Sequence, residues 1–589
     1  GRWLDNSLSM FLINRYIIVL LPYLASVESG QQVNDCISVQ KRSCADSKGK
    51  GTLHRLKTLA LLLLERSPVG AFNPCDAGIF PPTVHPSLAA STPLTLERRN
   101  RFGHDPNALT LTNEPSKANA LAEKEEDQQQ TREGRRGSRK TREDKQQTRE
   151  DSRKLLVDLE THGKQTLEDA SQGIPKVVLK NGKARLFRDG NPLVFSAAVG
   201  CVIGKQPKAG DAVLVADGAR TPIGWGMFNP NSSYRVRILQ NALDVTKHPN
   251  LVLNVKALVQ QRMHEAANLR RGLGVMPAST TSNKAFRLIN SESDGLSGII
   301  VDVFAHAAVV QSSAAWAEKH RNMIQDALRD EVGFVKKVIW QRAEAMLRLE
   351  GINTSDDGGV VSDAMEEGTD DHAVEVEEHG LKYLVDVQHG QKTGFYCDQR
   401  DNRAWLGSLP LKGKHVLDLC SYTGGFALNA ARGGAAKVIG VDSSQRAVET
   451  AQANAALNGF SNSTIEFRAA DALAEAGRYA QAGELFDVVI LDPPKLAPNA
   501  KAVSRAKRKY MQFQRAGMRA LRPGGILITC SCSGAVAQSG LLRDLVEDVA
   551  VQEGRRATLL RRAGAAPDHV ISSQYKESQY LDCLAYTIW

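Results

Sequence analysis

After Gln388 the chain alternates short apolar runs with longer stretches of mixed composition, and this alternation restricts its fold more than any other feature. Each run has the length of a β-strand and is largely apolar, which is typical of strands buried on both faces. Such strands, separated by helices, form doubly wound α/β domains with a parallel sheet. We therefore predict a Rossmann-like domain over residues 386–589. The expected strands cover residues 414–420, 437–442, 465–468, 486–491 and 525–532.

The turn after the first expected strand carries the features of a ligand site. Residues 421–426 open a helix, and Gly424 and Gly425 let the backbone approach a ligand. Asp442 ends the second strand, where a carboxylate can accept hydrogen bonds from a ribose diol. The turn lacks the G-x-G-x-x-G pattern of dinucleotide sites, and Asp418 would repel a pyrophosphate. S-adenosylmethionine carries a sulfonium and an ammonium group, which acidic residues stabilise, so we predict this methyl donor as the cofactor.

A second motif, Asp492-Pro493-Pro494-Lys495, follows the fourth expected strand. Enzymes that methylate exocyclic amines commonly carry an aromatic residue after the two prolines, whereas this chain has Lys495. The prolines stiffen the backbone beside the methyl donor, and the Asp492 carboxylate can hold the edge of a base. We therefore place Pro494 and Lys495 on the substrate side of the site.

Two cysteines, Cys530 and Cys532, lie at the end of the fifth expected strand, across the cleft from Asp492. Carbon 5 of a pyrimidine becomes nucleophilic only after a group adds at carbon 6, and a thiolate does this well. Most free cysteines are packed inside the protein, and this interpretation suits Cys530 and Cys420. Cys532 is followed by Ser-Gly, where the strand opens to the cleft, so we interpret Cys532 as the nucleophile.

The overall charge suits a polyanionic partner. The net charge is +10 with a pI near 9.0, which favours nucleic acid, although one basic tail would produce the same totals. The nine cysteines include no CxxC pair and no metal-ligand spacing, so we expect free thiols and no metal.

The N-terminal part has the composition of targeting and linker sequence. Residues 55–64 have a basic start and an apolar centre, which resembles a secretory signal, and an Ala-Phe pair follows within residues 67–74. This pattern resembles the bipartite presequences of plastid proteins and predicts a plastid or another organelle; an amphipathic surface helix on a cytoplasmic protein is the alternative. Residues 76–170 are rich in Gln, Ser and charge, so we expect residues 1–170 to be presequence and disordered linker. No later run is long enough to span a bilayer, so no membrane is expected.

Two further domains are expected between the linker and the α/β domain. Residues 174–245 contain short strand candidates separated by Gly, Pro and Asn turns, which predicts a small β-barrel. Arg235 and Arg237 share a strand face where phosphates can be met, although an ordinary solvated face explains them equally well. Residues 250–385 predict an α+β domain with an acidic, Gly-interrupted loop at 355–378 that projects into water, away from RNA. Its expected elements are helices over 251–271 and 317–329, a hairpin over 286–302 and a strand over 337–341.

In combination these motifs resemble the bacterial large-subunit (23S) ribosomal RNA cytosine-5 methyltransferase family, from about Pro175 to Trp589. The resemblance rests on four motifs: residues 388–400, 421–426, 492–495 and 531–534. It implies a PUA fold for the barrel, a class I methyltransferase domain with a seven-stranded sheet, and S-adenosylmethionine as cofactor. It also implies 5-methylcytosine in 23S-type rRNA as product, with rRNA as the partner and a homodimer left open.

The resemblance assigns roles to individual residues. Cys532 is implied as the nucleophile, with Asp492 beside it as a second catalytic residue, and the segment 392–400 is implied to cover the donor. The predicted cofactor contacts are Tyr396, Gln399, Arg400, Asp418, Ser421, Tyr422, Thr423, Gly424, Gly425, Asp442, Ser443, Asp471, Asp492 and Pro493. The predicted substrate contacts are Pro494, Lys495, Arg235 and Arg237.

Two other functions remain open. The chain could methylate another RNA or another ring atom, such as uridine C5 or a guanine nitrogen, although guanine methylation needs no nucleophile and leaves Cys532 unexplained. It could also be a non-catalytic RNA-binding assembly factor, a role that does not require Asp442, Asp471 and Asp492 together. The sequence identifies neither the target nucleotide nor the base that removes the C5 proton.

Overall fold

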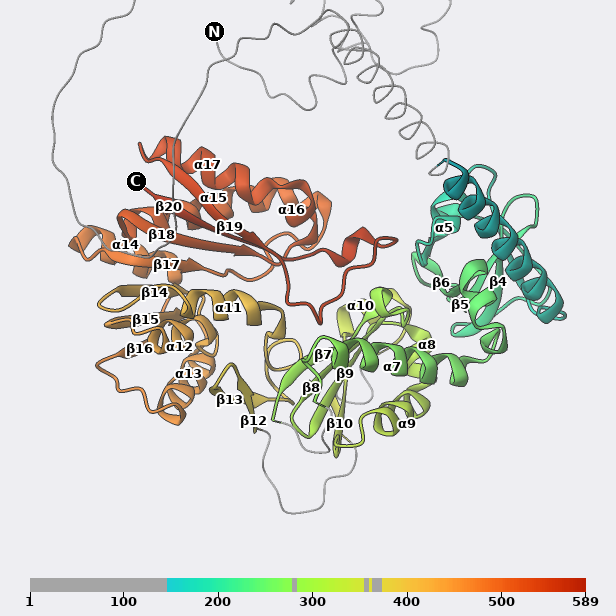
Figure 1. Cartoon of the computed structure of the whole chain (residues 1–589), viewed down its shortest axis with the longest axis horizontal. Helices are drawn as coiled ribbons and strands as arrows, with labels where there is room; N and C mark the ends of the chain where they lie inside the picture. Colours follow the sequence, from blue (N-terminus) through green and yellow to red (C-terminus); the bar gives the residue numbers. More distant parts are fainter. Residues whose placement is uncertain (1–145, 278–282, 354–359, 363–372) are drawn as a thin grey trace, which may run out of the picture. The chain divides into compact units, whose positions relative to one another are not determined.

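The computed structural model describes residues 146–277, 283–353, 360–362 and 373–589, all within one compact unit (Figure 1). The expected presequence and most of the expected linker lie outside the described residues, as does much of the acidic insertion. No helix among the described residues is both long and apolar enough to cross a membrane.

The C-terminal domain contains the predicted seven-stranded sheet. Its strands are β14 (His415–Leu419), β15 (Lys437–Asp442), β16 (Ile465–Ala469), β17 (Phe486–Leu491), β18 (Leu521–Ser531), β19 (Ala557–Ala563) and β20 (Asp582–Ile588). They are ordered β16-β15-β14-β17-β18-β20-β19, and β20 alone runs antiparallel to both of its neighbours. Strand β18 begins four residues earlier than expected and ends one residue before Cys532. The doubly wound prediction is therefore confirmed.

Helices cover both faces of this sheet (Figure 1). They are α11 (Arg400–Gly407), α12 (Gly425–Arg432), α13 (Gln445–Leu457), α14 (Ala472–Ala482), α15 (Val503–Ala520), α16 (Gly534–Ser539) and α17 (Leu541–Gln552). One hydrophobic core joins α11, α12 and α13 to the sheet, and a second core joins α14, α15 and α17 to it. Because both faces are covered, the central strands are apolar throughout rather than alternating.

A β-hairpin that we did not predict packs beside this domain. Strands β12 (Ala373–Glu378) and β13 (Leu381–Asp386) pair in antiparallel register, and Val374 and Val376 are buried in the core shared with α12 and α13. The Asn454 side chain of α13 accepts a hydrogen bond from the Leu384 amide at 2.8 Å. The predicted loop over 355–378 is therefore wrong for its last six residues, whose alternation of apolar and acidic side chains is that of a half-buried strand.

The barrel is a six-stranded sheet ordered β2-β6-β5-β4-β1-β3. Its elements are β1 (Lys176–Leu179), α5 (Arg185–Arg188), β2 (Leu193–Phe195), β3 (Val199–Ile203), β4 (Asp211–Ala216), β5 (Pro222–Phe228), β6 (Tyr234–Asn241) and α6 (Ala242–Lys247). The short strands expected within residues 174–245 correspond to strands of this sheet. The predicted barrel is confirmed.

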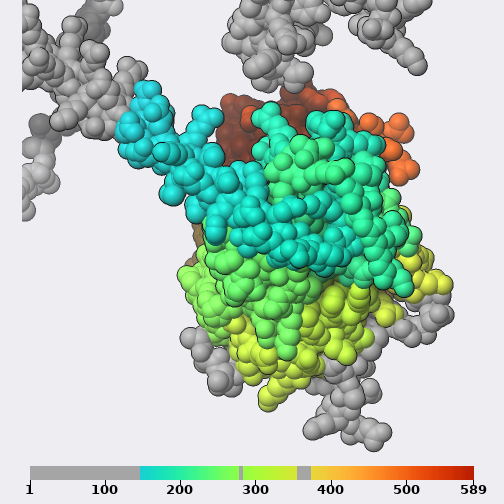
Figure 2. Space-filling model, turned by 90° about the vertical axis from the view of Figure 1, so that its right-hand side faces the viewer, coloured from blue at the N-terminus to red at the C-terminus, as the bar shows by residue number. Residues whose placement is uncertain are grey.

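Residues 146–170 form a helix rather than the expected disordered linker (Figure 1). In Figure 2 this segment, in cyan, lies along the surface of the barrel. Leu167 is fully buried, and the Thr246 hydroxyl of α6 donates a hydrogen bond to the Leu159 carbonyl at 2.6 Å. Gly163 lies so close to α6 that a Cβ atom there would overlap the Ala242 carbonyl oxygen. The segment has few apolar residues overall, although one of its faces packs against the barrel. The prediction of a disordered linker is therefore wrong for these residues.

The central domain holds a five-stranded sheet ordered β11-β10-β9-β8-β7. Its elements are α7 (Val255–Gly272), β7 (Ala285–Asn290), β8 (Ile299–Phe304), β9 (Ala307–Ser312), α8 (Ala315–Lys319), α9 (Arg321–Glu331), β10 (Lys337–Arg342), α10 (Glu344–Leu349) and β11 (Val360–Ser362). The predicted hairpin is β7–β8, and the single helix expected over 317–329 is divided into α8 and α9 at His320.

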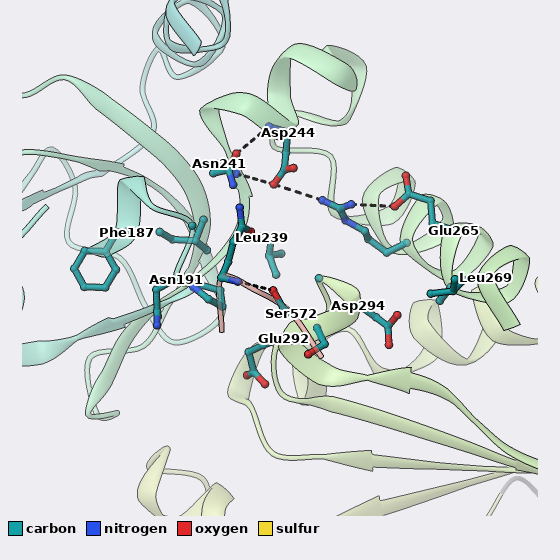
Figure 3. A pocket seen from close by; sticks show the side chains of 18 residues that line it. Phe187, Asn191, Leu239, Asn241, Asp244, Glu265, Leu269, Glu292, Asp294 and Ser572 are labelled. Atoms are coloured by element: carbon teal, nitrogen blue, oxygen red, sulfur yellow. Dashed lines mark hydrogen bonds and ion pairs between the residues drawn. The ribbon is translucent and has the colours of Figure 1, made fainter. Parts of the chain in front are cut away.

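The barrel and α7 meet around a polar cavity of about 250 Å³ (Figure 3). Arg262 lies 2.9 Å from a Glu265 oxygen and 3.7 Å from an Asp244 oxygen, which links α7 to α6. Glu292 and Asp294 also line this cavity. Its excess of carboxylates makes it unsuited to phosphate.

A C-terminal segment between β19 and β20 joins the central and C-terminal domains. The Asp568 carboxylate accepts hydrogen bonds from Arg400 at 2.6 and 3.2 Å and from the Arg287 amide at 2.8 Å. The Asp568 carbonyl accepts another from Arg270 of α7 at 2.6 Å. This segment therefore holds the two domains together on either side of the larger cavity described next.

Candidate active site

A cavity of about 880 Å³ lies at the C-terminal ends of β14, β15, β17 and β18, where doubly wound sheets bind ligands. Side chains from the central domain and from the C-terminal segment close its other sides. The predicted residues that line it are Tyr396, Gln399, Ser421, Tyr422, Thr423, Gly425, Asp442, Ser443, Asp471, Asp492, Pro493, Pro494, Lys495 and Cys532. The predicted residues that do not line it are Arg235, Arg237, Arg400, Asp418 and Gly424.

The turn after β14 is held by Asp442. One Asp442 oxygen accepts the Tyr422 amide at 2.9 Å and the other accepts the Ser444 amide at 2.9 Å. Gly424 has a φ of 85°, and a Cβ there would lie 2.7 Å from the Phe467 ring, so its role is to shape the turn. Asp442 thus faces the cavity with a fixed orientation and keeps lone pairs free for hydroxyl donors.

Asp471 stands at the start of α14 on the neighbouring strand end. Its carboxylate caps the helix by accepting the Ala474 amide at 2.8 Å, and the residue lines the cavity. The cap fixes the side chain, as it does for other Asp residues at the N-cap position. The cofactor contact predicted for Asp471 stays a prediction.

Asp418 lies behind the cavity wall and is fully buried. One of its oxygens accepts the Ala427 amide at 3.0 Å, and the other has no hydrogen-bond partner among the described residues. Burial, together with the charges of the Asp492 and Asp442 carboxylates, raises the pKa of Asp418 to about 8. The Ser421 hydroxyl nearby also lacks a partner. Two unsatisfied acceptors beside a cavity fit a bound cation that carries N–H donors, as S-adenosylmethionine does.

Asp492 lines the cavity at the end of β17, the neighbour of β14 in the sheet. Its carboxylate accepts a hydrogen bond from the Gln399 side chain at 3.1 Å. Burial, with a contribution from Asp398, raises the pKa of Asp492 to about 6. The carboxylate is therefore mostly ionised at neutral pH and can accept a hydrogen bond from an amino group.

Cys532 follows β18 directly and lines the cavity, whereas Cys530 is fully buried. Burial raises the pKa of the Cys532 thiol; Lys392 opposes this rise and Asp492 adds to it. The Tyr510 hydroxyl lies 2.8 Å from the Ser531 hydroxyl and 3.2 Å from the Ser533 hydroxyl, which fixes the chain on either side of the thiol. Cys530 is therefore part of the core, whereas Cys532 lies where the strand opens to the cavity; its role as the nucleophile stays a prediction.

The segment before α11 covers one side of the cavity. The Tyr396 ring meets Tyr422 edge-on at 5.0 Å, and the Lys392 ammonium lies 4.3 Å from the centre of the Tyr396 ring. The same ammonium lies 3.7 Å from Asp398, which also accepts the Tyr580 hydroxyl at 2.7 Å. Burial opposes ionisation of Asp398, but Lys392, His569 and that hydroxyl lower its pKa.

Lys392 and Asp398, within the segment 392–400 expected to cover the donor, also line the cavity. Three further lining residues, Lys509, Phe513 and Tyr580, were not predicted. Lys509 and Phe513 stand four residues apart on α15, a spacing that places them on one helix face, but only the fold shows which face meets the cavity.

Three predicted contacts need correction. Arg400 is buried and pairs with Asp568, so it holds the C-terminal segment rather than the cofactor. Arg237 is buried and pairs with Glu350 at 3.1 Å, because its strand face packs against the central domain. Arg235 is half-buried and donates to backbone carbonyl groups of residues 229 and 230. Strand alternation could not show that Arg237 is covered by the central domain.

Comparisons with known proteins agree with this geometry. A model of the S-adenosylmethionine-dependent methyltransferase family matches residues 363–559, and a model of PUA-like domains matches residues 177–241. The first match includes β12 and β13.

Curated relatives match most of the chain and nearly all of their own length. Ribosomal RNA large subunit methyltransferase I of Photobacterium profundum is 36% identical over 406 residues, covering 69% of this chain and 97% of the relative. The proteins of the same name from Shewanella denitrificans and Escherichia coli O157:H7 are 35% and 34% identical, covering 70% and 69% of this chain and 99% and 97% of the relatives.

Among solved structures, a candidate S-adenosylmethionine-dependent methyltransferase from Streptococcus mutans has a TM-score of 0.58 at 18% identity, covering 70% of this chain and 99% of its own. A candidate methyltransferase crystallised with SAH has the same TM-score at 19% identity, with the same coverage. These likenesses support the fold.

Proposed function

This chain belongs to the ribosomal RNA large subunit methyltransferase I family and is an S-adenosylmethionine-dependent methyltransferase, and we propose that it methylates carbon 5 of a cytosine in large-subunit rRNA. The observation that best supports this reaction is the position of Cys532, whose thiol lines the same cavity as Asp492 and Asp442. A nucleophile beside a methyl-donor site is required for attack at a pyrimidine carbon and is superfluous for methylation of a nitrogen.

The residues around β14 and β15 are those that would hold the donor. Asp442 offers a carboxylate for the ribose, Asp471 lies at the next strand end, and the unpartnered Ser421 hydroxyl lines the cavity, with the unpartnered Asp418 oxygen buried behind the wall. When bound there, S-adenosylmethionine supplies an electrophilic methyl group.

Cys532 starts the reaction at the pyrimidine. Its thiolate forms a bond to C6, the electron pair of the C5–C6 double bond moves toward C5, and C5 can then accept a methyl group. Removal of the C5 proton returns an electron pair to the ring, breaks the bond between sulfur and C6, and frees the thiolate. Lys392 favours the thiolate because its positive charge opposes the rise in the pKa of Cys532 caused by burial.

Asp492 supports cytosine over uridine as the substrate. With a pKa of about 6, it is ionised at neutral pH and accepts a hydrogen bond from the amino group at C4 of cytosine. Uridine carries an oxygen at that position, which would face the carboxylate as a second acceptor. The two prolines after Asp492 hold it in place beside the cavity.

Three further expectations concern targeting, metal dependence and oligomeric state. We propose that residues 55–74, which lie outside the described residues, direct the protein to a plastid or another organelle; microscopy of a fluorescent fusion tests this against the cytoplasm. The reaction as proposed uses no metal, so chelation with EDTA leaves turnover unchanged. Light scattering of the purified protein tests whether the working form is a homodimer.

Nucleoside mapping tests the reaction itself. Protein-free large-subunit rRNA is incubated with the enzyme and isotopically labelled S-adenosylmethionine, and the digested nucleosides are separated by mass. The proposal predicts label in 5-methylcytidine. Label in 5-methyluridine or methylguanosine would assign another substrate atom, and donor binding without any transfer would indicate an assembly factor.

A further inference from the structure

The first half of α15 presents unpaired positive charge beside the cavity. Arg505, Lys507, Arg508 and Lys509 are exposed, and none makes an ion pair with a described residue. The helix contains no Asp or Glu. In its second half, by contrast, Arg515 and Arg519 both pair with Glu553 at 2.8 and 2.7 Å. Free charge is thus confined to the half of α15 nearest the site.

Helical spacing directs part of this charge toward the cavity. Lys509 and Phe513 line the cavity, and Arg505 lies one turn before Lys509 on the same flank of the helix. Arg508 stands beside Arg505, three residues later. Lys507 lies on the opposite flank, because two residues turn an α-helix by about 200°. The helix therefore has a cavity-facing and a remote positive side.

Two neighbouring lysines extend the cavity-facing side. Lys495 lines the cavity directly after the two prolines, and Lys501 is exposed just before α15. Neither makes an ion pair with a described residue. The barrel offers no equivalent surface near its two predicted arginines, because Arg237 is buried among carboxylates and the adjoining cavity is acidic.

We propose that Lys495, Lys501, Arg505, Arg508 and Lys509, the α15 basic face, bind the phosphate backbone of the RNA strand that flanks the target base. This inference rests on the proposed function. A base that enters a cavity of this kind must leave its stack, so the phosphates on either side of it remain at the mouth. Positive side chains there neutralise the backbone without reading the sequence. The α15 basic face therefore sets RNA affinity, and the cavity sets the chemistry.

Charge-neutralising variants on the two sides of the helix test the proposal. Arg505→Gln and the double variant Arg505→Gln/Arg508→Gln remove charge from the α15 basic face, and Lys507→Gln removes one charge from the remote side. The probe is protein-free large-subunit rRNA transcribed in vitro, with the dissociation constant measured over a range of KCl concentrations. Donor affinity of each variant reports whether its fold is intact.

The expected changes follow from counterion release. One phosphate contact with single-stranded RNA contributes a slope of about 0.7 in log K against log salt, which is about fourfold in affinity at 0.15 M relative to 1 M. Arg505→Gln should therefore weaken rRNA binding about fourfold, and the double variant more than about tenfold, with a slope lower by about 1.4. Lys507→Gln should stay within about twofold of the wild type, because its side chain lies on the other flank of the helix and salt screens its longer-range attraction to phosphate.

Each alternative outcome overturns the proposal. Equal losses for Arg505→Gln and Lys507→Gln would indicate a general field rather than a contact face, and unchanged binding would remove the surface altogether. A loss seen with assembled large subunits but not with free rRNA would assign the face to a protein partner. If the wild-type enzyme methylates rRNA and the double variant binds rRNA normally, the α15 basic face is not the RNA-binding surface, and the proposed function stands. If the double variant loses rRNA affinity but the wild-type enzyme does not methylate rRNA, the binding surface stands and the proposed function fails.

Discussion

Asp418 and Asp492 lie at the ends of adjacent strands, yet the structure gives them different protonation states. Burial raises the pKa of Asp418 to about 8 and that of Asp492 to about 6. At neutral pH the first is therefore mostly protonated before a donor binds, while the second is mostly ionised. Environments that give two neighbouring carboxyl groups different pKa values are typical of sites that use the two groups for different tasks.

Replacing Asp418 tests its assignment. The unfolded chain loses this proton near pH 3.8, whereas the folded protein keeps it until about pH 8, so stability contributed by this group falls as pH rises from about 4 to 8. Asp418→Asn removes that penalty and should raise the melting temperature of donor-free protein at pH 7.5 while flattening its pH dependence over this window. Thermal unfolding followed across pH 4–9 measures both effects.

The same variant should bind the donor less well. Loss of the carboxylate is expected to weaken S-adenosylmethionine about tenfold, and S-adenosylhomocysteine less, because the latter lacks the sulfonium charge. Calorimetric titration with both ligands gives the comparison. Equal losses of affinity for the two ligands would show that Asp418 does not interact with the sulfonium charge.

Cys532 carries the chemistry that distinguishes a pyrimidine carbon as the target. Cys532→Ala should lower the methylation rate by more than about a thousandfold, as expected when an enzyme loses its covalent nucleophile, and leave donor affinity near normal. Cys530→Ala is the matched control, since this thiol is fully buried beside Cys583. Cys530→Ala should lower the melting temperature but retain turnover. Methylation rates measured with saturating rRNA therefore distinguish Cys532→Ala from Cys530→Ala.

Much of the site followed from sequence because strand ends in a doubly wound sheet meet at one edge. Asp442, Asp492 and Cys532 each end a predicted strand, and all three line one cavity. Arg237 and Arg400 were misplaced because charged residues can be buried when they are paired, and their partners, Glu350 and Asp568, are more than a hundred residues away in the chain.

At the scale of whole elements, the prediction succeeded where apolar runs were continuous and failed where polar residues hid a buried face. Strand β12 was taken for loop because Glu alternates with Val, and the helix at 146–170 was taken for linker because few of its residues are buried. Composition averages over both faces of an element, whereas packing depends on one of them.

Gly163 offers a direct test of how the helix at 146–170 docks. Gly→Ala inside a helix normally stabilises by about 0.5–1 kcal/mol. At Gly163 the added Cβ would overlap the Ala242 carbonyl, so Gly163→Ala should destabilise the barrel instead. Gly477→Ala in α14, where a Cβ has open space, is the control and should stabilise. Chemical denaturation of both variants measures whether the free energy of unfolding rises or falls. Stabilisation by Gly163→Ala would show that the helix does not pack on α6.

At the scale of the molecule, the active cavity lies between two domains that Asp568 holds together. Its carboxylate is fully buried, forms an ion pair with Arg400 and also accepts a hydrogen bond from the Arg287 amide. Burial opposes its ionisation, but His569 and Arg400 lower its pKa, so this stabilisation is present above about pH 4 and is lost as pH falls further.

Asp568→Ala should destabilise the protein by about 3–5 kcal/mol at pH 7, because it leaves a buried guanidinium without a partner. Asp189→Ala, which breaks an exposed pair with Arg185, should change stability by less than about 1 kcal/mol. Urea unfolding at pH 7 measures the difference between the two. Similar small losses for both would mean that the C-terminal segment does not hold the domains together.

The most direct test of the proposed chemistry is a trapping experiment with rRNA transcribed to contain 5-fluorocytidine. Fluorine at C5 cannot leave as a proton does, so the bond between the enzyme and C6 should persist after methyl transfer. The account predicts a stable complex that requires S-adenosylmethionine, with the modified nucleotide found by peptide mass mapping on Cys532. A complex through another residue, or methylation of normal rRNA with no trapped complex, would contradict it.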